Sequence, residues 1–171
     1  MKRTFPLFAA LALCLLLAAC SGAAAPTGAF SENDLGVAVG GDAYYLREDS
    51  APLIEALGDA YEYSAQVSCV YDGEDKVFSY PTGIAVSTGP VEGKDVVELI
   101  TLTANAYETL RGAKVGDTLE AVKKLYGEAY FDDGYLTYSL TNDAADIRAE
   151  RIQFEYVGGV VTRIFIYSPS Y

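Results

Sequence analysis

The chain has 171 residues, carries a formal net charge of −12 at pH 7 and contains no histidine. A surface this acidic is repelled by phosphate backbones and by anionic lipid headgroups, which argues against nucleic-acid binding. Without histidine the chain has neither an imidazole base nor a histidine metal ligand, so the commonest catalytic and metal-binding arrangements are excluded. The acidity has two interpretations: it attracts a basic partner, or it only keeps the protein soluble.

The amino-terminal segment has the pattern of an export signal. Two basic residues precede an apolar stretch, residues 5–17, that is shorter than the roughly 20 residues a membrane span needs. It ends in Leu17-Ala18-Ala19-Cys20, which resembles the lipobox of bacterial lipoproteins. The resemblance implies that residues 1–19 are removed as a signal peptide and that Cys20 receives a diacylglycerol. An ordinary secretory signal cut near residues 23–25 and an uncleaved anchor are the alternatives.

Lipidation of Cys20 would hold the protein on the extracytoplasmic face of the cell membrane, or on the outer membrane of an organism that has one. Because Lys2 and Arg3 are the only charged residues before position 20, cleavage leaves 10 basic and 24 acidic side chains and a net charge of −14. Residues 20–34 are rich in small and polar residues and predict a flexible tether. Residues 35–171 are predicted to form a single globular domain, long enough to bury a core.

Two short helices are predicted in this domain. The first begins at Ser50 as N-cap, tolerates Pro52 in its opening turn and ends at Gly58. The second is predicted to be capped by Asp117 and to end at Gly127. Its apolar residues, which we expect to face the core, are Leu119, Val122, Leu125 and Tyr126.

The chain also contains an internal similarity. Both helices run into related segments, Gly58-Asp59-Ala60-Tyr61 and Gly127-Glu128-Ala129-Tyr130, and each is followed by a strand and a long hairpin with a glycine turn. The first copy is expected to carry an extra strand and turn over residues 68–76. The spacing near 69 residues predicts two repeats, about 35–110 and 111–171.

The predicted fold class is therefore α+β. Two tandem helix-plus-antiparallel-meander modules would form a curved antiparallel sheet with short helices on one face.

Alternation along the strands separates two faces of the predicted sheet. One face is apolar and is expected to form the core, whereas the other is small and polar and is expected to be half-solvated. Cys69 is the only cysteine left for the domain, so no intramolecular disulfide is expected, and its alternating neighbours predict a buried structural residue. The predicted core face contains Tyr63, Val67, Cys69, Tyr71, Phe78, Tyr80, Ile84, Val86, Ile100, Leu102, Leu136, Tyr138, Ile152, Phe154, Ile164 and Ile166. The predicted solvated face contains Ser64, Gln66, Ser68, Ser79, Ser87, Thr101, Thr137, Gln153, Glu155 and Arg163.

The solvated face carries a candidate interaction surface formed by Tyr135, Arg163, Phe165 and Tyr167. Aromatic residues and arginine are enriched at the centres of protein interfaces. The alternative interpretation is that aromatics at alternate strand positions only form cross-strand pairs.

Acidic residues gather in two predicted turns. Asp72, Glu74 and Asp75 form one group, and Asp132 with Asp133 forms the other. Carboxylates of the first group are weak candidates for a calcium site, but they lack the ligand spacing of a helix-loop-helix calcium loop, so no metal or cofactor is expected. Acids in glycine-containing turns are usually solvated, which leaves carboxylate-based hydrolysis as a distant alternative.

Residues 112–127, with the core Gly-Asp-Thr-Leu-Glu-Ala-Val-Lys-Lys-Leu-Tyr-Gly, resemble the helix motif of tandem αβ modules. Such modules occur in the secreted β-lactamase inhibitor protein and in the small lipoprotein of the outer-membrane barrel assembly machinery. More closely, Ser68-Cys69, residues 73–76 and Tyr80 resemble an uncharacterised lipoprotein family of Gram-positive-type bacteria. That family supports the expected fold and location.

The expected function is a membrane-anchored, non-catalytic module that binds an envelope or secreted protein. A ligand- or calcium-binding sensor or structural module using the acidic loops is the alternative.

Overall fold

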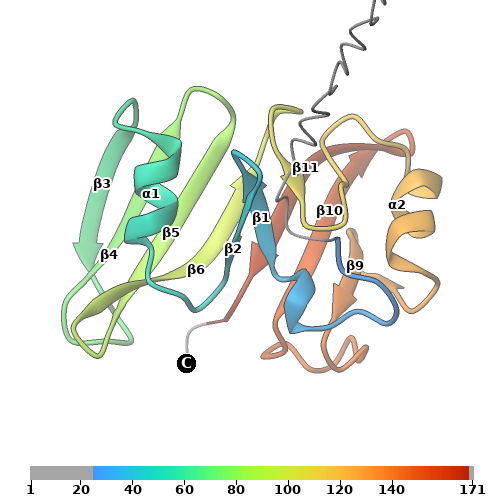
Figure 1. The fold of residues 1–171 in the computed structure, drawn as a ribbon. Coiled ribbons are helices and arrows are strands. Elements are labelled where there is room, and N and C mark those ends of the chain that lie inside the picture. Colours follow the sequence, from blue (N-terminus) through green and yellow to red (C-terminus); the bar gives the residue numbers. More distant parts are fainter. Residues whose placement is uncertain (1–24, 170–171) are drawn as a thin grey trace, which may run out of the picture.

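The computed structural model describes residues 25–169, so the expected signal peptide and Cys20 lie outside the described residues. The described part is mostly antiparallel sheet with two short α-helices (Figure 1), which confirms the α+β class. The elements in chain order are η1 (Glu32–Asp34), β1 (Gly36–Val39), β2 (Asp42–Tyr45), α1 (Ala51–Leu57), β3 (Glu62–Val67), β4 (Glu74–Tyr80), β5 (Ile84–Val91), β6 (Lys94–Leu102), β7 (Glu108–Thr109), α2 (Leu119–Tyr126), β8 (Phe131–Asp132), β9 (Leu136–Ser139), β10 (Arg151–Val157) and β11 (Val160–Tyr167).

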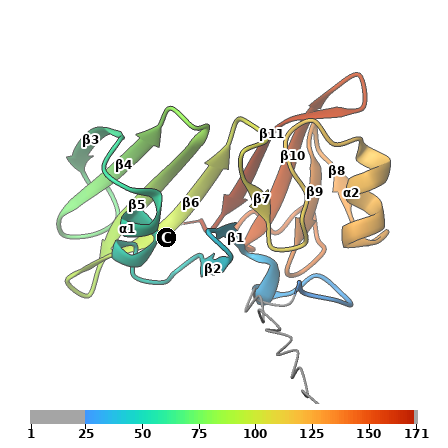
Figure 2. The same cartoon turned by 45° about the horizontal axis from the view of Figure 1, so that its top comes forward.

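Eight strands form one sheet in the order β3-β4-β5-β6-β11-β10-β9-β8, and β2-β1-β7 form a second, smaller sheet. Each helix precedes four consecutive strands of the large sheet, and β6 pairs antiparallel with β11 at its centre. Both helices and the small sheet lie on the same side of the large sheet (Figures 1 and 2). Within residues 25–169 the opposite side carries no helix (Figure 1), and we call it the open face.

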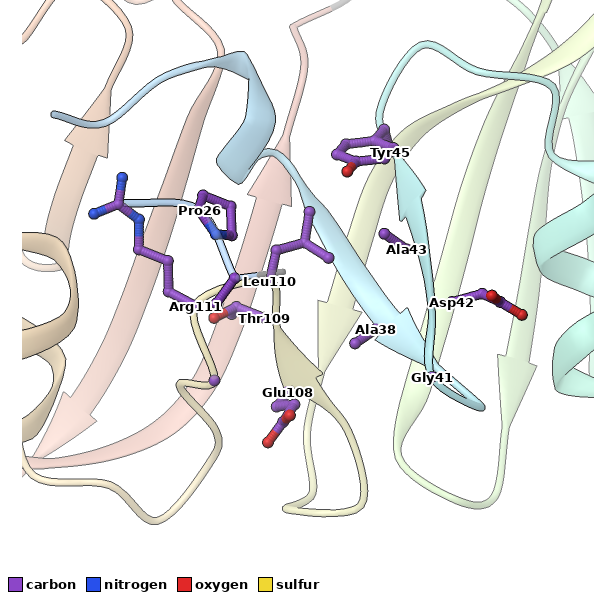
Figure 3. A pocket seen from close by; sticks show the side chains of 12 residues that line it. Pro26, Ala38, Gly41, Asp42, Ala43, Tyr45, Glu108, Thr109, Leu110 and Arg111 are labelled. Carbon is purple, nitrogen blue, oxygen red and sulfur yellow. The ribbon is translucent and has the colours of Figure 1, made fainter. Parts of the chain in front are cut away.

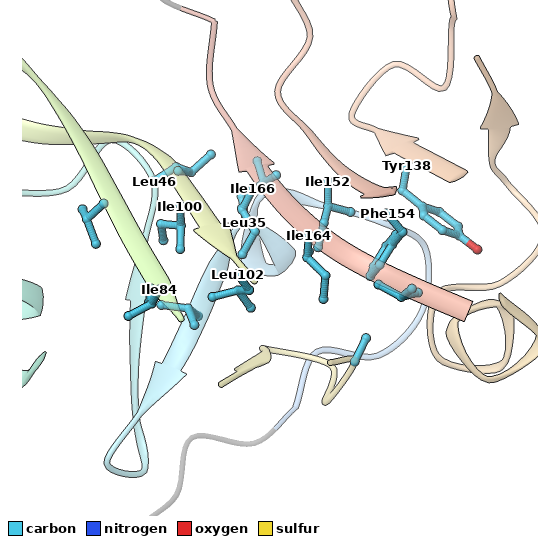
Figure 4. Close-up of a cluster of buried hydrophobic side chains, with 14 of the residues drawn as sticks. Leu35, Leu46, Ile84, Ile100, Leu102, Tyr138, Ile152, Phe154, Ile164 and Ile166 are labelled. Carbon is cyan, nitrogen blue, oxygen red and sulfur yellow. The ribbon is translucent and has the colours of Figure 1, made fainter. Parts of the chain in front are cut away.

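The hydrophobic core lies between the large sheet and the elements that cover it (Figure 4). At the centre, Ile100 stands opposite Ile166 and Leu102 opposite Ile164, and all four side chains have no exposed surface. Every predicted core-face residue from Tyr80 onward is buried. The covering elements contribute further buried side chains, among them Val37 of β1, Leu53 of α1, and Val122 and Tyr126 of α2.

The predicted helix limits are close to those observed, but neither predicted cap hydrogen bond forms. Ser50 occupies the N-cap position of α1 without a side-chain cap bond, and Asp49 accepts from the Ala51 amide instead. The hydroxyl of Thr118 accepts the hydrogen bond from the Ala121 amide at 3.2 Å, so Thr118 is the N-cap of α2. Asp117, predicted to be the cap, instead accepts from the Lys114 amide at 2.9 Å and closes the preceding turn. Leu125, predicted to face the core, is exposed.

Three of the five predicted core-face residues before Tyr80 are wrong, whereas Phe78 packs against the core as predicted. Cys69 is an exposed free cysteine in the turn between β3 and β4, and Tyr63 and Val67 of β3 are exposed as well. The hydroxyl of Ser68 accepts hydrogen bonds from the amides of Val70 and Tyr71, which turns the chain where the alternation predicted a continuing strand. Residues 68–73 are therefore a turn rather than part of an extra strand, and β4 begins at residue 74.

The expected tether is ordered at its end by a buried ion pair. Arg111 Nη2 donates to Asp34 Oδ2 at 2.8 Å and its Nε donates to Oδ1, with 4% and 0% of the two side chains exposed. Arg111 also donates to the carbonyls of Gly28, Ala29 and Leu125 at 3.0–3.1 Å, so all five of its N–H groups are used. The Asp34 hydrogen bonds raise the pKa of Arg111 and keep it charged. Residues 28–34 thus belong to the folded domain, earlier in the chain than the boundary expected at residue 35.

The open face is not bare along its whole length. Arg151 points to this face, where its Nε donates to the Ala149 carbonyl at 2.9 Å and its Nη2 donates to the Asp146 carbonyl. The loop 140–150 therefore folds back over Arg151 and neighbouring Ser139, which are both buried. Thr137, predicted to be solvated, is also buried, and its hydroxyl donates to Asp133 at 3.0 Å. The solvated part of the open face is consequently confined to its middle and to the β3 end.

Candidate functional site

The four predicted surface residues come together in the structure. Phe165 and Tyr167 lie on the open face of β11, and the ring of Tyr135, from the turn before β9, meets the ring of Phe165 edge to face at 6.0 Å between centroids. The guanidinium of Arg163 lies 5.7 Å from the centroid of the Phe165 ring. The period-two pattern of β11 places residues 163, 165 and 167 on one face, as the sequence predicted.

Two residues of the site were not among the predicted set. Leu99 of β6 stands opposite Tyr167, and Gln153 of β10 stands opposite Phe165. With Tyr135, Phe165 and Tyr167 they line a shallow pocket of about 240 Å³. We call these five residues, with Arg163 at the rim, the aromatic patch. Their side chains are half-buried, except for Arg163, which is exposed.

Leu99 was not singled out because it lies in an apolar run, next to a sheet irregularity and on the same side of it as Ile100. It belongs to a run of apolar residues in β6, and the register between β5 and β6 shifts between Ser87 and Thr88. A bulge adds one residue to one strand, so alternation read along that strand changes face at the bulge. Alternation read backward from Ile100 would have placed Leu99 on the open face.

Polar contacts fix parts of the aromatic patch. Arg163 Nη1 lies 3.4 Å from Glu155 Oε2 on the neighbouring strand, and both side chains are partly exposed. Gln153 donates from Nε2 to the Thr137 hydroxyl at 3.3 Å, which holds the amide across the floor of the pocket. Exposed pairs such as Arg163 and Glu155 contribute about 0–1 kcal/mol to stability. That weak pairing leaves Arg163 available to a partner at small cost.

A second cavity lies on the helix-bearing side, between β1, β2 and the segment after β7 (Figure 3). Its lining includes Pro26, Tyr45, Glu108 and Arg111. All five donors of Arg111 are already engaged within the protein, and Glu108 lies 3.7 Å from the ammonium of Lys114. Of the charged residues that line this cavity, Arg111 and Glu108 thus have partners within the fold, and we regard it as the weaker candidate for a binding site.

The acidic turn does not form a cation site. Asp72 and Glu74 are exposed and Asp75 is half-buried, and across residues 25–169 no group of three or more aspartate, glutamate or cysteine side chains is placed to hold a metal ion. The carboxylates of Asp132 and Asp133 accept hydrogen bonds from Tyr156 and Thr137. These contacts brace the β8–β9 turn beside the aromatic patch.

Neither helix in the described part of the chain is long and apolar enough to cross a membrane. No protein-family model matches the chain, and comparisons with curated proteins and with solved structures found no match either.

Proposed function

We propose that this protein is a non-catalytic interaction module of the cell envelope, anchored to the membrane through a lipid on Cys20. It binds an envelope or secreted protein through the aromatic patch. The observation that carries this proposal is the convergence of Tyr135, Phe165 and Tyr167 around one shallow pocket on a sheet face that bears no helix.

The size and chemistry of the pocket favour a protein side chain as the occupant. A pocket of about 240 Å³ is smaller than the 300–1,000 Å³ typical of small-molecule sites, so it suits a single apolar or aromatic side chain. Tyrosine, phenylalanine and arginine are the residues that most often anchor protein interfaces. The acidity of the chain favours a partner with a basic surface around that anchor.

We further propose that the domain consists of two tandem modules, α1 with β3–β6 and α2 with β8–β11. The strand order supports this, because each set of four strands has its first strand at an edge of the large sheet and its last strand, β6 or β11, at the centre. The related segments at residues 58–61 and 127–130 follow the two helices at equivalent positions. The aromatic patch would then lie across the junction, since Leu99 comes from the first module and the other residues come from the second.

The binding proposal is tested with a paired variant, Phe165→Ala with Tyr167→Ala, used as bait against detergent-solubilised envelopes of the source cells. The matched control is Val157→Ala, an exposed apolar residue at the end of β10 and outside the aromatic patch. We expect the wild type and the control to retain the same partner and the paired variant to lose it. Equal retention by all three proteins would rule out the aromatic patch as the binding site.

The anchor is tested separately. Intact-mass spectrometry of the native protein should find residues 1–19 absent and an acylated Cys20, and Cys20→Ala should release the protein from the membrane fraction. Because Cys20 lies outside the aromatic patch, this result and the partner-binding result are independent.

A further inference from the structure

Strand β3 forms an open edge of the large sheet. It pairs only with β4 among the described strands, and all six of its residues, Glu62–Val67, are exposed. The strand contains no proline and no lysine, and its register with β4 runs without a bulge. Prolines, lysines and β-bulges usually protect long edge strands in natural proteins, because the unpaired backbone groups of an edge can pair with another strand.

The hairpin pattern shows which backbone groups are unpaired. The Ser68 amide donates to the Gly73 carbonyl at 2.9 Å, so this pair is a hydrogen-bonded one. Hydrogen-bonded and non-hydrogen-bonded pairs alternate along antiparallel strands. Residues 62, 64 and 66 therefore direct their N–H and C=O groups toward β4, whereas Tyr63, Ala65 and Val67 direct theirs outward.

The opposite edge of the same sheet is protected. Strand β8 has only two residues, Phe131 and Asp132, and one of them is charged. The Asp132 carboxylate accepts a hydrogen bond from Tyr156 at 2.8 Å, which keeps that charge beside the edge. A short, charged edge is the usual protection against strand addition. Of the two edges of the large sheet in the described residues, the β3 edge is therefore the one suited to it.

We propose that β3 pairs antiparallel with β3 of a second copy of this chain, about a two-fold axis at Ala65. In this register Ala65 faces Ala65 of the second copy, and Tyr63 faces Val67 of the second copy. Each of these pairs can exchange two backbone hydrogen bonds, because the outward groups of one copy meet the outward groups of the other. The pairing is isologous and uses the edge in both copies, so assembly stops at a dimer.

The side chains of β3 are self-complementary in this register. Tyr63 is 53% exposed and Val67 is 78% exposed, and together they would form two aromatic–aliphatic cross-strand pairs, one on each side of the axis. On the other sheet face Ser64 meets Gln66 of the second copy, and Glu62 meets Ser68 of the second copy. No like charges stand opposite each other, although the chain as a whole is strongly acidic. This local charge pattern favours a second copy as the occupant.

The test measures the oligomeric state of the full chain, purified in a mild detergent, by sedimentation equilibrium over a range of concentrations. Ala65→Lys places two ammonium groups directly opposite each other at the axis, whereas Ser64→Lys adds the same charge facing a glutamine on the other side of the strand. We expect a reversible wild-type dimer, about tenfold weaker dimerisation for Ala65→Lys and a smaller change for Ser64→Lys. Equal weakening by both lysines would exclude the proposed axis.

Amide hydrogen exchange tests the register without a substitution. Raising the concentration of the wild-type protein should protect the amides of Tyr63, Ala65 and Val67, while those of Ser64 and Gln66 stay unchanged because β4 already holds them. A wild-type chain that stays monomeric at the highest concentration, or that dimerises without protecting these three amides, contradicts the proposal. Failure here leaves the aromatic patch untouched, because its residues lie on other strands.

Discussion

Asp34 and Arg111, 77 positions apart in the chain, form a two-pronged ion pair that is almost completely closed to solvent. The Asp34 carboxylate also accepts from the Ser31 amide at 2.8 Å, and the guanidinium lies 5.1 Å from the centroid of the Tyr126 ring. The pair thus connects the amino-terminal segment to α2.

Removing one partner of this pair should be costly. Asp34→Ala leaves the Arg111 charge buried and unpaired, and such losses cost about 3–5 kcal/mol. Urea denaturation followed by circular dichroism measures the change in the free energy of unfolding. The control is Glu108→Gln, because the Glu108–Lys114 pair is exposed and should contribute less than about 1 kcal/mol. Similar losses for both variants would show that the buried pair adds no special stability.

Two phenylalanines of the same hairpin, on opposite sheet faces, should respond differently to truncation. Phe154 is fully buried against Tyr126 and Tyr138, so Phe154→Ala should cost about 3–5 kcal/mol. Phe165 lies half-buried in the aromatic patch, and we expect Phe165→Ala to cost about 1 kcal/mol. Thermal denaturation of the two variants measures both losses of stability. A larger loss for Phe165→Ala than for Phe154→Ala would contradict the assignment of the core to the face that carries Phe154.

The fold should lose stability in alkaline solution. Burial raises the pKa of Tyr80 to about 12, and it also raises the pKa values of Tyr126 and Tyr138. The folded state therefore keeps these phenols protonated where the unfolded chain, with tyrosine pKa values near 10, releases their protons. Their contribution is complete below about pH 10 and is lost as the pH rises toward 12.

Urea midpoints measured from pH 8 to pH 11 would reveal this loss. The pKa of Lys76 is also raised, by its hydrogen bond to Asp95, so this pair too is weakened in alkaline solution and a tyrosine-specific control is needed. Tyr80→Phe removes one of the buried phenols and should flatten the decline in stability above pH 10. An unchanged slope in this variant would contradict the assignment to Tyr80.

The cap of α2 predicts a small but specific effect. Thr118→Ala removes the acceptor of the Ala121 amide and should lower the free energy of unfolding by about 1 kcal/mol. Thr118→Ser keeps a hydroxyl at the same position and should restore most of the stability. If serine and alanine behave alike at this position, the hydroxyl is not acting as a cap.

Cys69 should react with a thiol reagent in the folded protein, because its side chain is exposed in the β3–β4 turn. Rapid labelling in the absence of denaturant is the expected result, measured by the mass of the peptide that contains the residue. Cys69→Ser provides the control for reaction at other cysteines. Labelling only after denaturant is added would instead support the buried Cys69 that the alternating sequence predicted.

The parts of the fold that follow from local patterns were predictable. The limits of α1 and α2 depend on capping residues and glycines that are adjacent in the chain, and the long hairpins depend on alternation and turn residues. The three open-face residues of β11 followed from the same alternation. Local patterns therefore predicted most of the aromatic patch as well.

The errors arose where side chains or distant segments determine the structure. The Ser68 hydroxyl accepts two amide hydrogen bonds where β3 ends. Period-two alternation of apolar residues carries no information about such side-chain contacts. The Asp34–Arg111 pair joins residues too far apart for any local pattern, so the end of the tether looked unstructured. The small sheet was missed as well: its β1–β2 hairpin is local, but β1 pairs with β7 about 70 positions further along the chain.

Residues 28–34 attach to one side of the domain. Phe30 packs against Tyr138 and Tyr126 on the helix-bearing side, at 6.1 and 6.2 Å between ring centroids. Residues 25–29, the described part of the chain before Phe30, thus lie on the side opposite to the aromatic patch. If the chain is anchored through Cys20 as proposed, a bulky partner would reach the aromatic patch from the side opposite to this entering segment.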